Sequence, residues 1–589
     1  MRILSRSFIL FCIVFYTQIA SAAFKRPLQN KRAMVVSAHP LASYAGLKML
    51  QEGGNAIDAA VATTFAISVV EPFSAGIGGG GFLLLRNSKH RKIKALDFRE
   101  RAPLKATKNM YLDDKGKVRR NASINGYLAV GTPGTVAGMY EVHRRYGKLP
   151  WKTVVEPAVK LAKDGFIVSN RFVNAVKRRK KMIASNQEAR SIFTRDGNYY
   201  QSGEKLVQRD LGETLADIAS NPQSFYTGKI ARAISDDMAK NGGLITLEDL
   251  KSYKPIWREP VCGNFRKARV CSMPPPSSGG IHLVQMLNII GDTDLKSLGW
   301  QHPDAIHLLA EAMRIAYADR SEYLGDPDFV KVPQQQLISP EYAKLRRQQI
   351  NMQRANPSNQ IKPVSKEILE KFSQNPSSRL IPATSNPKSK TRKYHESTET
   401  SHLTVIDDQL NAVSLTFTVN LGFGAGVVTP GTGIVLNNEM DDFSAAPGVP
   451  NAFGLVGNEA NSIAPLKTPL SSMTPTIVTE KGRLRMALGT PGGSTIITQV
   501  LQIILNVLEY DMDAAAAVSA SRIHHQWLPD TLRVEPWGLD ALTLQELKRR
   551  GHKIRQTNTW GNSNLIIVKP DGTLEGAADS RGEGEARGI

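Results

Sequence analysis

The sequence predicts a mixed α/β fold, and three features carry that prediction. Residues 58–70 form an Ala-, Val- and Ile-rich run that is typical of a buried helix. Residues 304–319 carry apolar side chains at helical spacing, which indicates an amphipathic helix packed on the core. Residues 412–420 alternate strictly between apolar and polar side chains, the pattern of a β-strand. The chain shows no internal repeat, and helical and strand-like segments are mixed along it.

Length and composition fit a large globular protein. At 589 residues the chain exceeds what one hydrophobic core normally organises, so two domains or two interlocked halves are expected. Its 41% hydrophobic and 22% charged residues are ordinary values. The 75 basic and 53 acidic side chains give a net charge of +22, which favours anionic partners in general. No motif directs this charge to nucleic acid or to a membrane, so we expect a basic, solvated surface and no nucleic-acid partner.

The N-terminus has the layout of a secretory signal peptide. Arg2 and Arg6 precede an apolar run at residues 8–16, and small residues follow at 20–22. The run is too short to span a bilayer as a helix, and no later segment is long and apolar enough to do so. We therefore expect cleavage after Ala22, with residues 1–22 removed, and a secreted protein without a membrane span, periplasmic if the host is a Gram-negative bacterium.

Three cysteines are present, and the predicted leader contains Cys12. Cys262 and Cys271 remain, nine positions apart around a short basic loop. In an oxidising compartment a disulfide between them is expected, and the alternative is two separate buried thiols.

The glycine-rich residues 76–81 superficially resemble a phosphate-binding loop. They follow the helix predicted at 58–70 and lead into an apolar strand at 82–85. A dinucleotide site needs the opposite order, from strand to helix, so nucleotide binding is not expected.

The pattern of the sequence changes sharply at Thr400. Residues 372–399 are rich in Ser, Pro, Asn, Lys and Thr without periodicity and indicate an exposed linker. A strand-like segment then reaches Ile406, and the strand at 412–420 follows. A threonine at such a junction can become a new N-terminus, and its α-amine can then activate its own hydroxyl for attack on an acyl group. That interpretation makes the chain a proenzyme.

One face of the strand at 412–420 carries a row of small polar side chains: Ser414, Thr416, Thr418 and Asn420. Beside a reactive threonine such a row could contribute to a catalytic site. The alternative is the solvent-facing side of an antiparallel sheet.

A glycine pair precedes another predicted helix. Residues 474–479 and 483–488 indicate a hairpin, and an apolar helical face begins at Ile497. The backbone N–H groups of Gly492 and Gly493 would lie just before the N-terminus of that helix, where donors favour developing negative charge. This could be an oxyanion hole, and the alternative is a tight turn.

Other chemistries lack their signatures. The sequence contains no HExxH motif, no CxxC pair and no GxSxG elbow. His524 and His525 are adjacent rather than four residues apart, which does not suit metal binding on a helix. We expect neither a metal nor an organic cofactor.

The segment TSHLTVID at residues 400–407 closely resembles the start of the small subunit of γ-glutamyltranspeptidases, which cleave themselves immediately before a nucleophilic threonine. Further segments resemble signatures of the same family in the same order: DFRE at 97–100, GTPGTVAG at 131–138, YADR at 317–320, LNNEMDDF at 436–443, PLSSMTP at 469–475 and GTPGG at 489–493. The resemblance covers nearly the whole mature chain. It implies the αββα sandwich of N-terminal nucleophile hydrolases, with two stacked sheets between helical layers.

The resemblance also implies roles for individual residues. Cleavage between Glu399 and Thr400 would give a large subunit, residues 23–399, and a small catalytic subunit, residues 400–589, as a heterodimer. Thr400 would be the nucleophile and its α-amine the base. Thr418 would hydrogen-bond the nucleophile, and Gly492 and Gly493 would bind the oxyanion.

The donor substrate is zwitterionic at its α-carbon, and the resemblance supplies partners for both charges. Arg99, with Ser471 and Ser472, would bind the α-carboxylate, for which a guanidinium offers parallel hydrogen bonds. Asn420, Glu439 and Asp442 would surround the α-ammonium, while Asp441 is expected to be structural.

Two positions depart from the family pattern. Residues 447–454 resemble the lid loop of many bacterial members, but Phe453 stands where many carry a tyrosine that can hydrogen-bond the strand asparagine. We therefore expect a looser lid and an altered ratio of hydrolysis to transfer. Ser401 stands where threonine is frequent, and because it keeps a hydroxyl we expect a mild effect.

The resemblance implies an enzyme that cleaves γ-glutamyl amide bonds through a threonine ester. Its donors would be glutathione and other γ-glutamyl compounds, and the acyl group would pass to water, amino acids or dipeptides. One alternative is a related glutaryl or cephalosporin acylase, which does not need the ammonium partners. The other is an uncleaved, inactive basic protein at the cell surface.

Overall fold

The computed structural model describes residues 26–372 and 399–589. The predicted leader at residues 1–22 and all but the two ends of the predicted linker at 372–399 lie outside these residues. Across the described ranges, no helix combines the length and apolar character that a bilayer crossing requires.

Two seven-stranded antiparallel sheets form the centre of the molecule. The strands of the first sheet are, in spatial order, β1 (Leu28–Asn30), β22 (Leu574–Ala578), β21 (Asn564–Val568), β17 (Arg483–Gly489), β16 (Thr476–Glu480), β11 (Ala268–Ser272) and β10 (Val261–Phe265). Those of the second are β23 (Glu585–Gly588), β2 (Met34–Ser37), β12 (Ser401–Ile406), β13 (Ala412–Thr418), β3 (Gly80–Asn87), β4 (Lys92–Asp97) and β9 (Ile256–Arg258). Each sheet therefore contains strands from both sides of residue 400.

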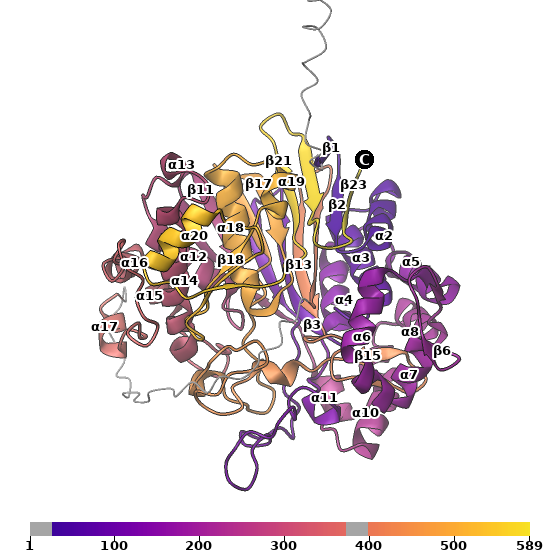
Figure 1. Ribbon diagram of the computed structural model, residues 1–589. Coiled ribbons are helices and arrows are strands. Elements are labelled where there is room, and N and C mark those ends of the chain that lie inside the picture. The colour runs from indigo at the N-terminus through magenta and orange to yellow at the C-terminus, as the bar shows by residue number, and fades with distance from the viewer. Residues whose placement is uncertain (1–25, 373–398) are drawn as a thin grey trace, which may run out of the picture.

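The sheets stack face to face, and a helical layer covers each outer face (Figure 1). Apolar side chains from both sheets, including Val36, Phe82, Ile477 and Ile566, form the core between them. This arrangement is the predicted αββα sandwich, so the fold-class prediction is confirmed.

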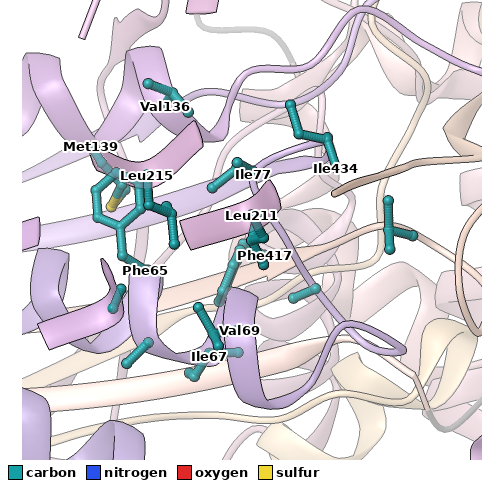
Figure 2. Close-up of a cluster of buried hydrophobic side chains, with 14 of the residues drawn as sticks. Phe65, Ile67, Val69, Ile77, Val136, Met139, Leu211, Leu215, Phe417 and Ile434 are labelled. Carbon is teal, nitrogen blue, oxygen red and sulfur yellow. The ribbon is translucent and has the colours of Figure 1, made fainter. Parts of the chain in front are cut away.

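The helices α2 (Pro40–Gln51), α3 (Ala56–Val70), α4 (Thr135–Tyr146), α5 (Trp151–Asp164) and α8 (Arg209–Ser220) contribute to the core outside the second sheet. Figure 2 shows Phe65, Ile67 and Val69 of α3 in one cluster with Phe417 of β13. The helix begins two residues before the predicted start because Asn55 and Asp58 form a reciprocal capping box. Its burial on all sides agrees with its apolar sequence.

The helices α12 (Gly279–Ile290), α14 (Pro303–Tyr323), α18 (Ile496–Leu508) and α19 (Ala514–Ser519) contribute to the core outside the first sheet. The prediction of an amphipathic helix at 304–319 packed on the core was right about the helix and its packing, but the helix is not buried on one face only. Almost every side chain of α14 is buried, polar ones included. Its charged residues are accommodated by ion pairs, for example Arg346 with Asp319 at 3.3 Å.

The polar row on β13 does not face solvent, so that alternative was wrong. Ser414 donates to the Leu488 carbonyl on the facing sheet at 2.8 Å, and Thr416 contacts the His402 ring at 2.8 Å. The row therefore lies between the two sheets, where each hydroxyl has a hydrogen-bond partner available.

The predicted hairpin and disulfide are both present. β16 and β17 are joined by Lys481 and Gly482, both at positive φ, the two-residue turn that matches strand twist. Cys262 and Cys271 are bonded and lie directly opposite each other on β10 and β11. The disulfide prediction is confirmed, and it closes the hairpin at the edge of the first sheet.

The remaining elements lie at the periphery. The further helices are α6 (Asn170–Ser185), α7 (Gln187–Phe193), α9 (Ser224–Thr227), α10 (Lys229–Lys240), α11 (Leu247–Ser252), α13 (Leu295–Leu298), α15 (Gln334–Leu337), α16 (Pro340–Arg347), α17 (Lys366–Glu370) and α20 (Ala541–Arg549). Short strands form four small sheets: β14 (Val427–Thr429) with β15 (Ile434–Leu436), β18 (Ile523–His524) with β19 (Leu532–Val534) and β20 (Ile554–Gln556), β5 (Phe166–Ile167) with β8 (Lys205–Leu206), and β6 (Thr194–Arg195) with β7 (Asn198–Tyr199).

Candidate active site

Thr400 lies immediately before the central strand β12, and its hydroxyl points at the neighbouring strand. Its Oγ1 is 2.9 Å from Oγ1 of Thr418, at the end of β13, and both residues are buried. The backbone of Thr400 has a φ of +151°, a region that residues other than glycine rarely adopt. The structure therefore places the threonine hydroxyl at a residue whose backbone conformation is strained.

Glu399 is also buried, and its Oε1 pairs with Nη2 of Arg178 in α6 at 2.7 Å. This ion pair holds the residue before Thr400 against the large N-terminal segment. Ser401, one of the two departures from the family pattern, donates to Oε2 of buried Glu71 at 3.2 Å. A serine hydroxyl is therefore sufficient for that contact.

Thr400 and most of the predicted site residues line one small cavity. Its wall contains Arg99, Thr400, Thr418, Asn420, Glu439, Asp442, Phe453, Leu455, Ser471, Ser472, Met473, Gly493 and Ile496. The cavity volume is about 20 Å³, close to the space needed for one water molecule. A substrate the size of a glutamyl group therefore needs the lid, which contributes Phe453 to the wall, to move.

Gly492 and Gly493 have backbone conformations suited to glycine, with φ values of +137° and +55°. A Cβ on Gly493 would lie 2.5 Å from the ring of Phe453. Neither amide N–H has a hydrogen-bond acceptor within the described parts of the chain. Gly492 precedes the 3₁₀ turn η4 (Gly493–Thr495) and Gly493 is its first residue; the turn continues into α18, so two unused donors are present at the start of a helix. Only Gly493 lines the cavity.

Arg99 is the centre of a buried charge cluster. Its Nη1 is 2.7 Å from Oε1 of Glu439, its Nη2 is 2.5 Å from Oδ2 of Asp442, and its Nε donates to the carbonyl of Pro469 at 3.1 Å. The side chain of Arg99 is 1% exposed, so its charge depends on these carboxylates for compensation. The predicted carboxylate-binding and ammonium-binding groups thus contact each other directly.

A third carboxyl group, that of Glu100, belongs to the same cluster. Burial raises the pKa of Glu100 to about 7, against the opposing charge of Arg99. Burial likewise raises the pKa values of Glu439 and Asp442. Both carboxyl oxygens of Glu100 are buried, and neither accepts a hydrogen bond from a side chain of the described residues. The Glu100 carboxyl therefore keeps its proton at acidic pH and loses it as pH rises through about 7.

The polar atoms of the remaining predicted site residues differ in whether they already have a hydrogen-bond partner. Nδ2 of Asn420 donates to the Asn438 carbonyl at 2.9 Å. Oγ of Ser471 accepts from the amide of Met473 at 3.0 Å. Oγ of Ser472 is buried at the cavity without a partner in the described residues. Ser472 therefore keeps a free donor at the cavity.

Three polar contacts hold the lid loop, residues 447–454, over the cavity. Nδ2 of Asn451 donates to Oδ1 of Asp442 at 3.2 Å, and the amide of Ala452 donates to Oδ2 of Asp441 at 2.9 Å. Nε2 of Gln526 donates to the Phe453 carbonyl at 3.1 Å. Phe453 has no hydroxyl that could hydrogen-bond Asn420. The lid is held instead by the contacts of Asn451, Ala452 and the Phe453 carbonyl.

Sequence reasoning missed Asn451, Gln526 and Glu100. The Asn451 side chain also accepts from the amides of Phe453 and Leu455, an Asx-type turn that an asparagine in a Pro- and Gly-rich loop could have indicated. Glu100 lies in the DFRE segment at residues 97–100, but its surroundings depend on Glu439, which is far away in sequence. No sequence signal would have identified Gln526.

One cluster outside the cavity has the composition of a metal site. Ligand atoms of His307, Glu311 and His552 all lie within 4.8 Å of one another. However, Nδ1 of His307 already contacts Nε2 of His552 at 2.8 Å, and Glu311 pairs with Arg314 and accepts from Asn356 at 2.7 Å. We therefore interpret the cluster as a buried hydrogen-bond network that connects α14 with His552, and not as a metal site.

Comparison with known proteins places these observations in one family. The family model described as gamma-glutamyltranspeptidase matches residues 42–589. The chain is 47% identical over 557 residues to a glutathione hydrolase proenzyme of Escherichia coli (strain K12), covering 94% of this chain and 91% of that one. A solved structure of Helicobacter pylori gamma-glutamyltranspeptidase is 46% identical, with a TM-score of 0.55, and covers 59% of this chain and 97% of that one. A cephalosporin acylase from Bacillus halodurans is 29% identical, with a TM-score of 0.81, and covers 97% of this chain and 98% of that one.

Proposed function

Since this chain belongs to the γ-glutamyltranspeptidase family and is an enzyme that hydrolyses and transfers γ-glutamyl groups, we propose that Thr400 is its nucleophile and the cavity beside it is the donor site. The observation that carries this proposal is the Thr400–Thr418 hydrogen bond next to the buried cluster of Arg99, Glu439 and Asp442. These groups combine a nucleophile with partners for both charges of a zwitterion.

Maturation would use the same hydroxyl. Oγ1 of Thr400 attacks the carbonyl carbon of Glu399, the peptide C–N bond breaks, and an ester forms as the α-amine of Thr400 is released. Water hydrolyses the ester and frees the carboxylate of Glu399. The unusual φ of Thr400 supports this step because strain in the starting peptide is relieved when the bond breaks. The products would be residues 23–399 and 400–589, held together as a heterodimer.

In turnover, the free α-amine of Thr400 would act as the base. Its reference pKa of about 7.7 to 8 leaves a useful neutral fraction near physiological pH. The Thr400 hydroxyl transfers its proton to this amine and attacks the γ-carbonyl, whose oxygen becomes an oxyanion that the N–H groups of Gly492 and Gly493 stabilise. The amide C–N bond then breaks, the leaving amine takes the proton, and a γ-glutamyl ester remains. Water or an acceptor amine attacks that ester and regenerates the enzyme.

Donor recognition would divide between the two ends of the charge cluster. The α-carboxylate would share Arg99 with the existing carboxylates and accept a hydrogen bond from the free hydroxyl of Ser472, with Ser471 beside it. Glu439 and Asp442, together with Asn420, would receive the α-ammonium. A compound without the ammonium would leave excess negative charge buried, which is costly.

We infer from these groups that glutathione and other γ-glutamyl compounds are the donors and that amino acids or dipeptides are the acceptors. The glutathione hydrolase proenzymes among the relatives support the donor class. Their naming as proenzymes also supports a processed extracellular or periplasmic enzyme, for which the predicted leader at residues 1–22 would be the export signal. Nucleic acid is not a proposed partner.

The alternative of a glutaryl or cephalosporin acylase has one supporting observation, the fold similarity to the cephalosporin acylase over nearly the full chain. A single comparison separates the two activities. The processed protein is assayed with a γ-glutamyl anilide and with a glutaryl anilide, which differ only by the α-ammonium. We expect a strong γ-glutamyl preference, and a glutaryl preference would reassign the enzyme to the acylases.

Intact-mass measurement tests the nucleophile itself. The wild-type protein should appear as two chains with a boundary between Glu399 and Thr400, and Thr400→Ala should stay as one chain without anilide hydrolysis. A Thr400→Ala protein that still splits at this bond would refute the mechanism. An uncleaved, inactive wild-type protein would instead support the surface-protein alternative.

A further inference from the structure

A second groove, distinct from the donor cavity, lies where strand β4 meets the two hairpins at the edge of the first sheet. Its volume is about 940 Å³. Three separate segments supply its exposed basic side chains: Arg91, Lys92 and Lys94 at β4, Lys267 and Arg269 at the β10–β11 turn, and Lys481 at the β16–β17 turn. None of the residues that line the donor cavity lines this groove. We call it the basic groove.

The charges of the basic groove are largely uncompensated. Arg91, Lys92, Lys267, Arg269 and Lys481 make no ion pair with a carboxylate of the described chain. Arg266, which also lines the groove, pairs with Glu509 at 3.0 Å. Only one acidic side chain, Glu259, is among the groove residues. Clustered unpaired charges of one sign repel each other and raise the local concentration of an anionic ligand.

The backbone holds these side chains in place. Lys92 and Lys94 alternate with Ile93 on one strand and so point to the same face, where Nζ of Lys94 donates to the hydroxyl of Tyr146 at 3.2 Å. The disulfide Cys262–Cys271 lines the groove and fixes the hairpin that ends in Lys267. Lys481 is in a two-residue turn with defined geometry. The groove is therefore formed by connected sheet elements, so a ligand would meet a partly preorganised surface.

The shape and the lining residues of the groove indicate which class of anionic ligand it would bind. A flat bilayer cannot enter a concave groove, and none of the large exposed apolar residues of the described chain lines it. No described side chain in the lining is aromatic, so bases of a single-stranded nucleic acid would have no stacking surface. Glu259 and exposed Asn264 can accept hydrogen bonds from hydroxyl groups, which a chain of phosphates alone does not offer. These features fit a chain that alternates anionic groups with hydroxyls.

We propose that the basic groove binds a linear sulfated polysaccharide. This function goes beyond the γ-glutamyl chemistry and uses none of its residues. Lys481 follows residue 400 in the chain and the other five basic residues precede it, so the ligand would contact both products of the proposed cleavage. The enzyme would thereby be retained on sulfated glycan surfaces with its donor cavity free.

The test uses the processed wild-type protein and a heparin dodecasaccharide as probe, with the dissociation constant measured by calorimetry at several salt concentrations. The triple variant Lys92→Gln, Lys267→Gln, Lys481→Gln removes one charge from each segment. We expect its dissociation constant to rise at least about tenfold and the slope of log affinity against log salt to fall by about one per lost contact.

A matched control removes three exposed lysines that have no ion pair and lie outside the groove, Lys115→Gln, Lys117→Gln and Lys152→Gln. It has the same net charge as the groove variant and should bind heparin within about twofold of wild type. Equal losses in the two variants would mean that net charge alone drives binding and would overturn the proposal. Anilide hydrolysis should be unchanged in both, which verifies folding.

Two further measurements on the wild-type protein keep the proposal testable if the triple variant fails to fold. Lysine acetylation followed by mass spectrometry should show that heparin protects Lys92, Lys267 and Lys481 and leaves Lys115 reactive. Binding to oligo-dT or to phosphatidylglycerol vesicles should be weaker than binding to heparin at equal ionic strength. Tighter binding to either of these, or no protection of the groove lysines, would refute the sulfated-glycan assignment.

Discussion

Thr400 immediately precedes β12 and Thr418 ends the neighbouring strand β13, and the 2.9 Å contact between their hydroxyls fixes the direction of the proposed nucleophile. Thr418 is itself oriented because its Oγ1 also accepts from the amide of Asn420 at 2.8 Å. With that amide as donor to Thr418, the hydroxyl hydrogen of Thr418 is available to Thr400 or to the Ser74 carbonyl. The position of the attacking oxygen thus depends on one side chain that does not itself react.

We expect Thr418→Val to lower kcat for γ-glutamyl anilide hydrolysis by about 10- to 100-fold, since one hydrogen bond to the nucleophile is lost. The volume of the side chain is nearly conserved, so KM should change little. Single-turnover kinetics with the processed protein would measure the acylation step. Thr418→Ser keeps the hydroxyl and should restore most of the rate, and a serine variant as slow as the valine variant would exclude the hydrogen bond as the cause.

The raised pKa of Glu100 predicts a pH dependence of donor binding. Because the pKa of Glu100 is raised to about 7, the cluster gains a negative charge as pH rises through 7. The inhibition constant of L-glutamate, which carries the ammonium, should therefore fall by up to about tenfold between pH 6 and pH 8. That of glutarate, which lacks the ammonium, should not fall. A parallel fall for both compounds would contradict the assignment.

The variant Glu100→Gln supplies the control for this prediction, and its inhibition constant for L-glutamate should be nearly independent of pH. Stability gives a second readout. A carboxyl with a raised pKa in the folded state binds its proton more tightly there than in the unfolded chain, so its contribution to stability falls as pH rises from about 4.5 to about 7. The melting temperature of Glu100→Gln should exceed that of wild type at pH 8 and match it near pH 5.

At the scale of elements, the lid loop at residues 447–454 is linked to the donor site through one carboxylate. Asp442 accepts from Asn451 with Oδ1 and binds Arg99 with Oδ2. A donor ammonium that approaches Asp442 therefore competes with the lid for the same group. Opening of the lid and arrival of the substrate are connected by this competition.

We expect Asn451→Asp to open the lid, because it places a second carboxylate against Asp442 at the present distance of 3.2 Å. Proteolysis within residues 447–454 should be at least about tenfold faster, and the ratio of hydrolysis to transfer should increase as water gains access. Asn451→Ala removes the bond without adding charge and should give a smaller effect. Phe453→Tyr adds a hydroxyl within the lid and should change the ratio in the opposite direction, and unchanged proteolysis in Asn451→Asp would rule out this contact as a latch.

Sequence reasoning reached the elements and the residue types but not their partners. The helix at 58–70, the strand at 412–420 and the hairpin around Lys481 follow from local periodicity and turn chemistry, which act over a few residues. The burial of α14 on almost all sides and the interior position of the polar row on β13 could not be predicted, because both depend on what another layer contributes. For the same reason the sequence predicts a substrate carboxylate as the partner of Arg99 but not its ion pairs with Glu439 and Asp442, which form only in the folded protein.

At the scale of the whole molecule, each sheet combines strands that precede residue 400 with strands that follow it. β12 lies between β2 and β13, and β16 pairs with β11 on one side and β17 on the other. The core between the sheets also draws residues from both segments. Neither segment could keep its sheets intact without the other.

The two chains of the processed protein should therefore remain together without a covalent link. We expect one gel-filtration peak that contains both chains in 1 M NaCl, because the interface is mainly an apolar core and backbone hydrogen bonds that salt does not screen. In urea, dissociation and loss of secondary structure should coincide in a single transition. Separation of folded chains before unfolding would show that the interface is weaker than the interleaved sheets imply.

The position of Thr400 at the start of a central strand has a consequence for how the enzyme could be produced. An ordinary chain terminus lies at the periphery and can fray, but here the new terminus would begin in the middle of a sheet, held between β2 and β13. A separately synthesised segment that starts at residue 400 would have to insert its β12–β13 hairpin between β2 and β3 of the other chain, and its initiator methionine would occupy the place of the amine. Uninterrupted synthesis avoids both obstacles, because the strand pairs while it is still internal to the chain and the terminus appears only afterwards. Co-expression of the two halves from separate genes should consequently be a poor substitute for the single precursor.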